Sequence, residues 1–130
     1  MNDNIVLQTN KNARGNLYIA EVAKHIPFNI KRFYVITNVP PGEARGTHAH
    51  KNTEQAVFCL RGSFELLTDD GMTKKTQKLS DPAKGVPLPS RVWHSLSNFS
   101  EGSIALVVAS EPYDESDYIR DYQDFLEYVK

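Results

Sequence analysis

The sequence predicts an all-β domain, either a sandwich or a small barrel, that ends in a short amphipathic helix. Many short segments of alternating or apolar residues are separated by turn residues, which is typical of such folds. Near the C-terminus the apolar period changes from two residues to three and four. The length corresponds to one domain, residues 1–130. The jelly roll is the variant that encloses a lined cavity between two sheets.

The first half of the chain holds three predicted strands. Residues 4–7 and 17–22 are short strands separated by turn residues at 11–16. Residues 31–39 form a clearer strand, which Pro40-Pro41-Gly42 ends. Its side chains alternate between two faces, one with Phe33, Val35, Thr37 and Val39, the other with Arg32, Tyr34, Ile36 and Asn38.

The second half continues in the same style. Asp69-Asp70-Gly71 is a strong hairpin signal between two strands. Residues 104–109 are rich in β-branched side chains, and we expect this strand to be buried on both faces. The predicted strands of this half are 54–60, 64–68, 72–79, 86–88, 92–96 and 104–109.

The C-terminal stretch has helical periodicity. Asp114, Ser116 or Asp117 could be its N-cap. We expect a short amphipathic helix packed on the outside of the sheet. Its apolar face comprises Tyr118, Ile119, Tyr122, Phe125, Leu126 and Val129.

Composition excludes several classes of partner. A net charge of −1 gives no electrostatic case for nucleic acid or for a membrane surface. The single cysteine, Cys59, lies in an apolar run, so we expect it to be buried and no intrachain disulfide to form. No stretch approaches 18 apolar residues or resembles a signal peptide. These features predict a cytoplasmic protein.

The stretch Arg45-Gly46-Thr47-His48-Ala49-His50 carries the most distinctive chemistry. His48 and His50 are two residues apart, so in a strand their imidazoles share a face. Such a pair suits proton transfer or metal binding, because imidazole has a pKa near neutrality.

The surrounding spacing resembles the cupins and implies a cupin jelly roll. A second, partial motif is formed by Pro89, His94 and Asn98. Gln55 fits best where a metal-binding cupin has its carboxylate, and a neutral amide binds hard and borderline cations more weakly. We therefore expect no metal, although His48, His50, His94 and Glu54 remain an alternative ligand set. The first motif consists of Gly42, His48, His50, Glu54 or Gln55, and Gly62.

Further motifs resemble a narrower family, the sugar-nucleotide 3,4-ketoisomerases that act on dTDP-4-keto-6-deoxyglucose. The resemblance implies exchange of a C4 ketone and a C3 hydroxyl through an enediol, which requires no cofactor in principle. His48 would be the base and acid at carbon, and His50 would serve the oxygens or share the shuttle, although the reverse assignment stays open. The motifs are Arg14-Gly15-x-Leu17, Ile30-Lys31-Arg32-x-Tyr34, residues 45–51, Glu54-Gln55, Gly62, Trp93-His94 and residues 113–120.

The resemblance also implies the remaining site residues and partners. Tyr34 would polarise a ketone or position a hydroxyl. The substrate carries a diphosphate, for which Arg45 is the first candidate because guanidinium binds phosphate in a bidentate manner. The other expected substrate-binding residues are Arg14, Arg32, Lys51, Gln55 and His94. A homodimer that shares N-terminal strands is expected, with the product entering a surface polysaccharide such as lipopolysaccharide or an S-layer glycan.

Two other functions remain open at this stage. One is a metal-dependent cupin enzyme, such as a sugar isomerase or dioxygenase, which would hold stoichiometric metal. The other is a cupin that binds a sugar nucleotide without catalysis, which would leave the sugar's carbon-bound protons untouched.

Overall fold

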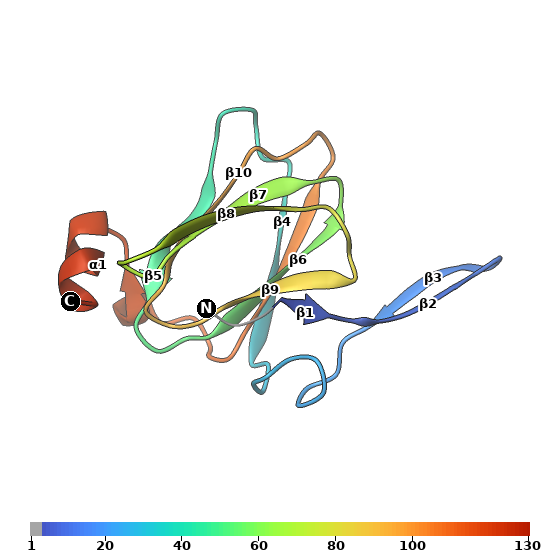
Figure 1. The fold of residues 1–130 in the computed structure, drawn as a ribbon, viewed down its shortest axis with the longest axis horizontal. Coiled ribbons are helices and arrows are strands. Elements are labelled where there is room, and N and C mark those ends of the chain that lie inside the picture. The colour runs from blue at the N-terminus through green and yellow to red at the C-terminus, as the bar shows by residue number, and fades with distance from the viewer. Residues whose placement is uncertain (1–3) are drawn as a thin grey trace.

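Two five-stranded antiparallel sheets face each other and enclose the interior (Figure 1). The computed structural model describes residues 4–130. The first sheet contains, in spatial order, β1 (Ile5–Val6), β9 (Lys84–Leu88), β6 (Gln55–Arg61), β11 (Ile104–Ala109) and β4 (Arg32–Thr37). The second contains β12 (Tyr118–Ile119), β5 (Arg45–His50), β10 (Trp93–Ser97), β7 (Phe64–Asp69) and β8 (Lys74–Leu79). This arrangement confirms the cupin jelly roll.

The main core lies between the sheets, because each strand turns one face of alternating side chains inward. Phe64 and Leu66 of β7 and Val57 of β6 are fully buried. Cys59 is also buried, as predicted. The complete cluster is Ile36, Val57, Cys59, Phe64, Leu66, Leu79, Val86, Leu88, Leu96, Ala105 and Val107.

Strand β4 places polar as well as apolar side chains on its inner face. Arg32, Tyr34 and Ile36 share the more buried face of β4, whereas Phe33 and Val35 are exposed on the other. The predicted alternation is therefore confirmed for residues 32–37. It is wrong for Asn38 and Val39, because the strand ends at Thr37, Asn38 turns the chain with a φ of +58°, and Val39 packs against the core on the side of Tyr34. Among the described strands β4 is also the edge of the first sheet, next to β11 alone.

The N-terminal region differs from the prediction. A two-stranded hairpin of β2 (Gln8–Asn12) and β3 (Gly15–Ile19) extends away from the barrel (Figure 1). The sequence predicted turn residues across 11–16 and a strand at 17–22. β2 was missed because its side chains are all polar and exposed, so no apolar pattern marks it.

The C-terminal helix is shorter than its periodicity suggested. Helix α1 spans Tyr122–Tyr128, and its N-cap is Asp121, not Asp114, Ser116 or Asp117. Asp114 instead caps the 3₁₀ helix η1 (Glu115–Asp117). The next two residues form β12, because pairing with β5 outweighs the helical pattern.

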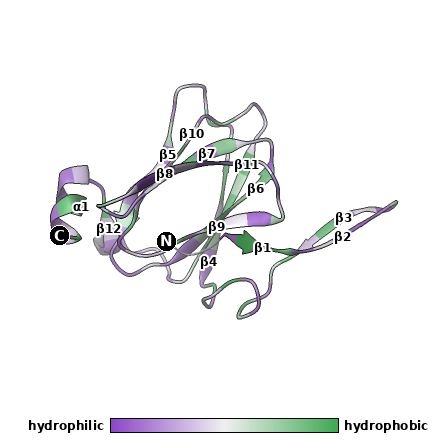
Figure 2. Ribbon diagram, in the orientation of Figure 1, coloured by the Kyte–Doolittle hydropathy of each residue, from purple (hydrophilic) through white to green (hydrophobic). Residues whose placement is uncertain are grey.

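Helix α1 packs on the outer face of the second sheet, as predicted. Phe125 is fully buried there against Trp93, Ala49 and Ile119. Figure 2 shows hydrophilic and hydrophobic residues alternating along this helix, which fits one packed and one exposed face. Within residues 4–130, no helix has the length and apolar character that crossing a bilayer requires.

Candidate active site

Strand β5 brings its two histidines to the interior. His48 and His50 are 9% and 2% exposed, while Ala49 between them points to the opposite face, against α1. His94 on β10 lies directly opposite His48 in the strand register. The sheet therefore gathers three of the four histidines of the sequence into one buried group.

A bulge at Gly46 orients the third ring. The pairing of β5 with β10 changes register here, and Gly46 has a φ of +66°, a conformation that glycine adopts without strain. Its carbonyl accepts a 2.8 Å hydrogen bond from Nδ1 of His94. His94 consequently keeps its proton on Nδ1, and its Nε2 is the atom free to accept one.

The three imidazole rings lie close together. The ring centroid of His48 lies 5.0 Å from that of His50 and 4.9 Å from that of His94. Burial, with the neighbouring His94 and His50, lowers the pKa of His48 to about 3. Burial also lowers the pKa of His50, and burial and His50 lower that of His94 to about 4. All three rings are thus uncharged at neutral pH.

The C-terminal segment covers this group of histidines. Asp117 accepts a 2.8 Å hydrogen bond from Nδ1 of His50. The ring of Tyr118 lies 4.8 Å from that of His48 and 4.4 Å from that of His50, centroid to centroid. Within residues 4–130, Nε2 of His48 and Nε2 of His50 are buried and have no hydrogen-bond partner.

Gln55 and Tyr34 form a second polar pair nearby. The amide nitrogen of Gln55 donates a 3.0 Å hydrogen bond to the Tyr34 hydroxyl oxygen. The Gln55 carbonyl oxygen is buried without a partner among the described residues. Burial raises the pKa of Tyr34, so its phenol stays protonated.

A pocket of about 380 Å³ opens onto His48. Three of its lining residues, Arg32, Arg45 and Arg120, carry guanidinium groups, and none of the lining residues is acidic. A site with this charge favours an anionic ligand. The lining consists of Arg32, Tyr34, Val35, Ile36, Arg45, Gly46, Thr47, His48, Tyr118 and Arg120.

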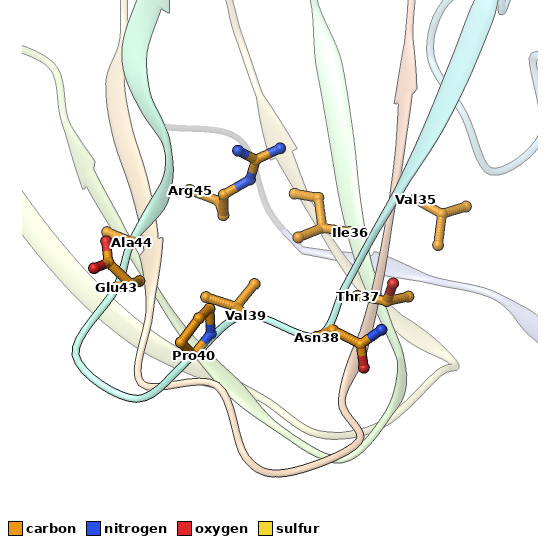
Figure 3. A pocket seen from close by; sticks show the side chains of 9 residues that line it. All are labelled: Val35, Ile36, Thr37, Asn38, Val39, Pro40, Glu43, Ala44 and Arg45. Atoms are coloured by element: carbon orange, nitrogen blue, oxygen red, sulfur yellow. The ribbon is translucent and has the colours of Figure 1, made fainter.

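A second pocket, of about 440 Å³, adjoins the first and shares Val35, Ile36 and Arg45 with it. Figure 3 shows the Arg45 guanidinium beside this opening, with Val39 and Pro40 beneath it. The two pockets together offer an extended surface around Arg45, which suits a ligand of several linked groups.

The donor set departs from that of a metal cupin. His48, His50 and His94 place possible ligand atoms within 4.8 Å of one another, and such a trio could hold a metal ion. Glu54, the carboxylate of the alternative ligand set, has an exposed side chain, while its neighbour Gln55 is buried in the interior. The buried oxygen is therefore that of a neutral amide, which binds hard and borderline cations more weakly than a carboxylate.

The structure separates the predicted site residues into two groups. The first group lies together around the buried histidines and the arginine-lined pocket. It consists of His48, His50, His94, Tyr34, Gln55, Arg45 and Arg32. Lys51 instead lies near helix α1, with its amine 5.9 Å from the centre of the Tyr128 ring. Arg14 lies in the turn of the extended hairpin.

Sequence reasoning missed three residues of the site, namely Asp117, Tyr118 and Arg120. The signal was present, because all three belong to the motif at residues 113–120 that carried the family resemblance. The guanidinium of Arg120 lies 4.3 Å from the centre of the Tyr118 ring. It also forms two hydrogen bonds with Glu115, at 2.8 and 2.9 Å, which hold it at the pocket.

Comparison with known proteins gives the family. The family model described as "FdtA: WxcM-like, C-terminal" matches residues 2–130. The chain belongs to this family. A similar curated protein is TDP-4-oxo-6-deoxy-α-D-glucose-3,4-oxoisomerase of Aneurinibacillus thermoaerophilus, 44% identical over 117 residues that cover 90% of this chain and 84% of the relative.

Solved structures of 3,4-ketoisomerases have the same fold. A 3,4-ketoisomerase from Helicobacter canadensis superposes with a TM-score of 0.94 at 39% identity, covering 98% of this chain and 96% of the other. A variant of the 3,4-ketoisomerase QdtA from Thermoanaerobacterium thermosaccharolyticum also superposes with a TM-score of 0.94, at 36% identity, covering 98% and 92%. That variant has a histidine replaced by asparagine and is in complex with TDP-4-keto-6-deoxyglucose.

Proposed function

We propose that this FdtA-family protein is a 3,4-ketoisomerase that converts TDP-4-keto-6-deoxyglucose into a TDP-3-keto-6-deoxyhexose. The observation that carries the proposal is a group of three uncharged histidines at a pocket lined by three arginines. The first feature suits proton transfer and the second suits a diphosphate. The names of the relatives supply the substrate.

The reaction moves hydrogen without any net change of oxidation state. A base removes the proton from C3, which is acidic because it is adjacent to the C4 ketone. The electron pair forms a C3–C4 double bond, and the C4 oxygen takes a proton to give the enediol. Loss of the proton from the C3 oxygen then re-forms a ketone at C3, while an acid protonates C4.

His48 is the proposed base and acid at carbon, because it is the histidine that lines the pocket. His50 lies deeper, and it would take protons from the sugar oxygens or from His48. The positive charges of Arg120 and Arg32 contribute to the low pKa of His48. A bound diphosphate would offset these charges and raise that pKa toward the range useful for catalysis.

Tyr34 is the proposed donor to the oxygen on which negative charge develops. Its oxygen accepts a hydrogen bond from Gln55, which leaves the phenolic hydrogen free to point toward the sugar. The unpartnered carbonyl of Gln55 could accept a hydrogen bond from a sugar hydroxyl. The ring of His94 would pack beside that of His48, with its Nε2 as a further hydrogen-bond acceptor.

Arg45, Arg32 and Arg120 are the proposed ligands of the diphosphate. Each lines the pocket, and guanidinium matches phosphate oxygens in a bidentate geometry. Lys51 and Arg14 remain weaker candidates, because both lie outside the pocket of a single chain. Arg14 would reach a substrate only across an interface with a second copy.

We also propose a homodimer. Phe33 and Val35 are 66% and 49% exposed on the edge strand β4, and Leu17 is 55% exposed on the extended hairpin. An apolar edge strand and an extended hairpin are surfaces that a second copy could cover. Analytical ultracentrifugation should give twice the monomer mass at micromolar concentration, whereas a monomer would reject this part of the proposal.

The proposed location is the cytoplasm, as expected from the sequence. A single unpaired cysteine suits a reducing compartment, so we place the enzyme in the cytoplasm. Its product would feed the synthesis of a surface polysaccharide, lipopolysaccharide or an S-layer glycan.

Incubation with TDP-4-keto-6-deoxyglucose in deuterated water tests the proposed activity. We expect NMR to show conversion to the 3-keto sugar with deuterium entering at C3 or C4, because the histidine protons exchange with solvent. A protein that binds the nucleotide sugar but leaves its carbon-bound hydrogens unchanged would be a binding protein, and the proposal would fail.

A further inference from the structure

Asp117 is the charged group that contacts the histidine cluster most directly, and it comes from outside both histidine-bearing strands. It lies at the end of η1, and its side chain is 8% exposed. One carboxylate oxygen accepts hydrogen bonds from Nδ1 of His50 at 2.8 Å and from the Thr53 hydroxyl at 2.5 Å. The other accepts from the backbone N–H of Asn52 at 2.7 Å.

These contacts determine which atom of His50 carries hydrogen. Burial alone would raise the pKa of Asp117, but the hydrogen bonds from Thr53, Asn52 and His50 outweigh it and keep the pKa below its usual value. An ionised carboxylate only accepts hydrogen bonds, so Nδ1 of His50 must be the donor. In the uncharged ring the lone pair is then on Nε2.

Nε2 of His50 lies on the side of the ring away from Asp117, because Nδ1 faces the carboxylate. It is buried and has no hydrogen-bond partner within residues 4–130. The rings of His48 and His94 lie 5.0 and 6.0 Å away, centroid to centroid. A proton leaving the sugar or His48 would therefore meet an acceptor atom at this point.

We infer that Asp117 is a positioning residue of the isomerase, which fixes His50 as the Nδ1–H tautomer and thereby keeps Nε2 available as a proton acceptor. The expected effect of Asp117 on the reaction rate rests on the proposed function. The tautomer itself is a property of the substrate-free protein.

The substitution Asp117→Asn separates this role from simple support of the fold. The Asn side-chain oxygen can still accept from Asn52 or Thr53, so the loop keeps a partner. Its NH₂ group, however, can donate to Nδ1 of His50, which would place the ring proton on Nε2. Asp114→Asn is a matched control, because Asp114 belongs to the same segment and caps η1 without contacting a histidine.

The first measurement is the two-bond ¹H–¹⁵N NMR correlation of the histidine rings at pH 7.5, without substrate. We expect the Nδ1–H pattern for His50 in the wild type and in Asp114→Asn, and the Nε2–H pattern in Asp117→Asn. An Nε2–H pattern in the wild type overturns the inference even if the protein proves to have no isomerase activity.

The second measurement is the steady-state rate with TDP-4-keto-6-deoxyglucose. Loss of a proton acceptor should lower kcat of Asp117→Asn by about 10²- to 10⁴-fold while KM changes little. Asp117→Glu, which keeps the carboxylate, should recover part of this loss. A variant Asp117→Asn with wild-type kcat, or one whose defect lies in KM alone, would overturn the positioning role.

Discussion

The amide nitrogen of Gln55 donates a 3.0 Å hydrogen bond to the hydroxyl oxygen of Tyr34. The two residues come from neighbouring parts of one sheet, on β6 and β4, with β11 between them. At the place of a metal-binding carboxylate, this chain thus has an amide that orients a phenol. Gln55 therefore replaces a metal ligand and also orients Tyr34, the proposed donor to the sugar oxygen.

Replacement of Tyr34 by Phe should remove the hydrogen-bond donor while preserving the ring. We expect kcat to fall by about 10²-fold or more, as for loss of one oxyanion-stabilising donor. Tyr128→Phe on helix α1 is the control and should behave as the wild type. If Tyr34→Phe retained full kcat, Tyr34 would have only a packing role.

Gln55→Glu should restore the carboxylate of a metal cupin beside His48, His50 and His94. After incubation with Zn²⁺ or Mn²⁺ and dialysis, elemental analysis should find about one ion per chain in this variant and much less in the wild type. Gln77→Glu on strand β8 controls for added charge. Equal metal content in Gln55→Glu and the wild type would show that the amide does not decide metal binding.

His48→Asn should abolish turnover, because the base at carbon is removed. The expected loss is at least about 10²- to 10⁴-fold in kcat. The affinity for TDP, measured by calorimetry, should stay within about threefold of the wild type, since the diphosphate ligands remain. His25→Asn, outside the pocket, provides the comparison. Unchanged turnover in His48→Asn would reject the assigned role.

Arg45→Ala should mainly weaken binding of the diphosphate. Loss of a charge-assisted contact should raise the dissociation constant of TDP by about 10- to 100-fold. The exposed Arg61, on the far end of β6, gives the control Arg61→Ala. Equal affinities for TDP in the two variants would place the phosphates elsewhere.

The buried histidines should make stability fall in mild acid. The folded-state pKa is about 3 for His48 and about 4 for His94, against an ordinary value of 6.5. At a pH between the folded-state and unfolded-state pKa values, the unfolded chain binds more protons than the folded protein. The free energy of unfolding is therefore at its full value above about pH 6.5 and declines as the pH falls. Urea unfolding should lose about 2 kcal/mol or more between pH 7.5 and pH 5. A flat profile over this range would contradict the low pKa values.

Much of the barrel could be predicted from the sequence. Strand β11 was predicted with its observed bounds, Ile104–Ala109. The placement of His48 and His50 on one face of their strand followed from their two-residue spacing, because alternation along a strand is geometric. That this face points inward is shown by the structure, where both side chains are buried. The burial of Cys59 followed in the same way from its apolar run.

The elements that escaped prediction depend on partners far along the chain. Tyr118 and Ile119 carry a helical pattern, yet they pair with His50 and Ala49 of β5. A strand of two residues has no periodicity of its own, so only its partner specifies it. The same pairing places Asp117 at His50, and for this reason the sequence did not reveal its role.

In the proposed reaction, the paired histidines His48 and His50 relay hydrogen between C3 and C4 of a TDP-linked sugar. A crystal structure of His48→Asn with TDP-4-keto-6-deoxyglucose would show whether the sugar binds at these histidines. We expect C3 or C4 to lie within about 3.5 Å of the side chain at position 48. The diphosphate should contact Arg45, Arg32 or Arg120. A wild-type complex in which the three histidines hold a metal ion, or a sugar bound away from them, would rule out this relay.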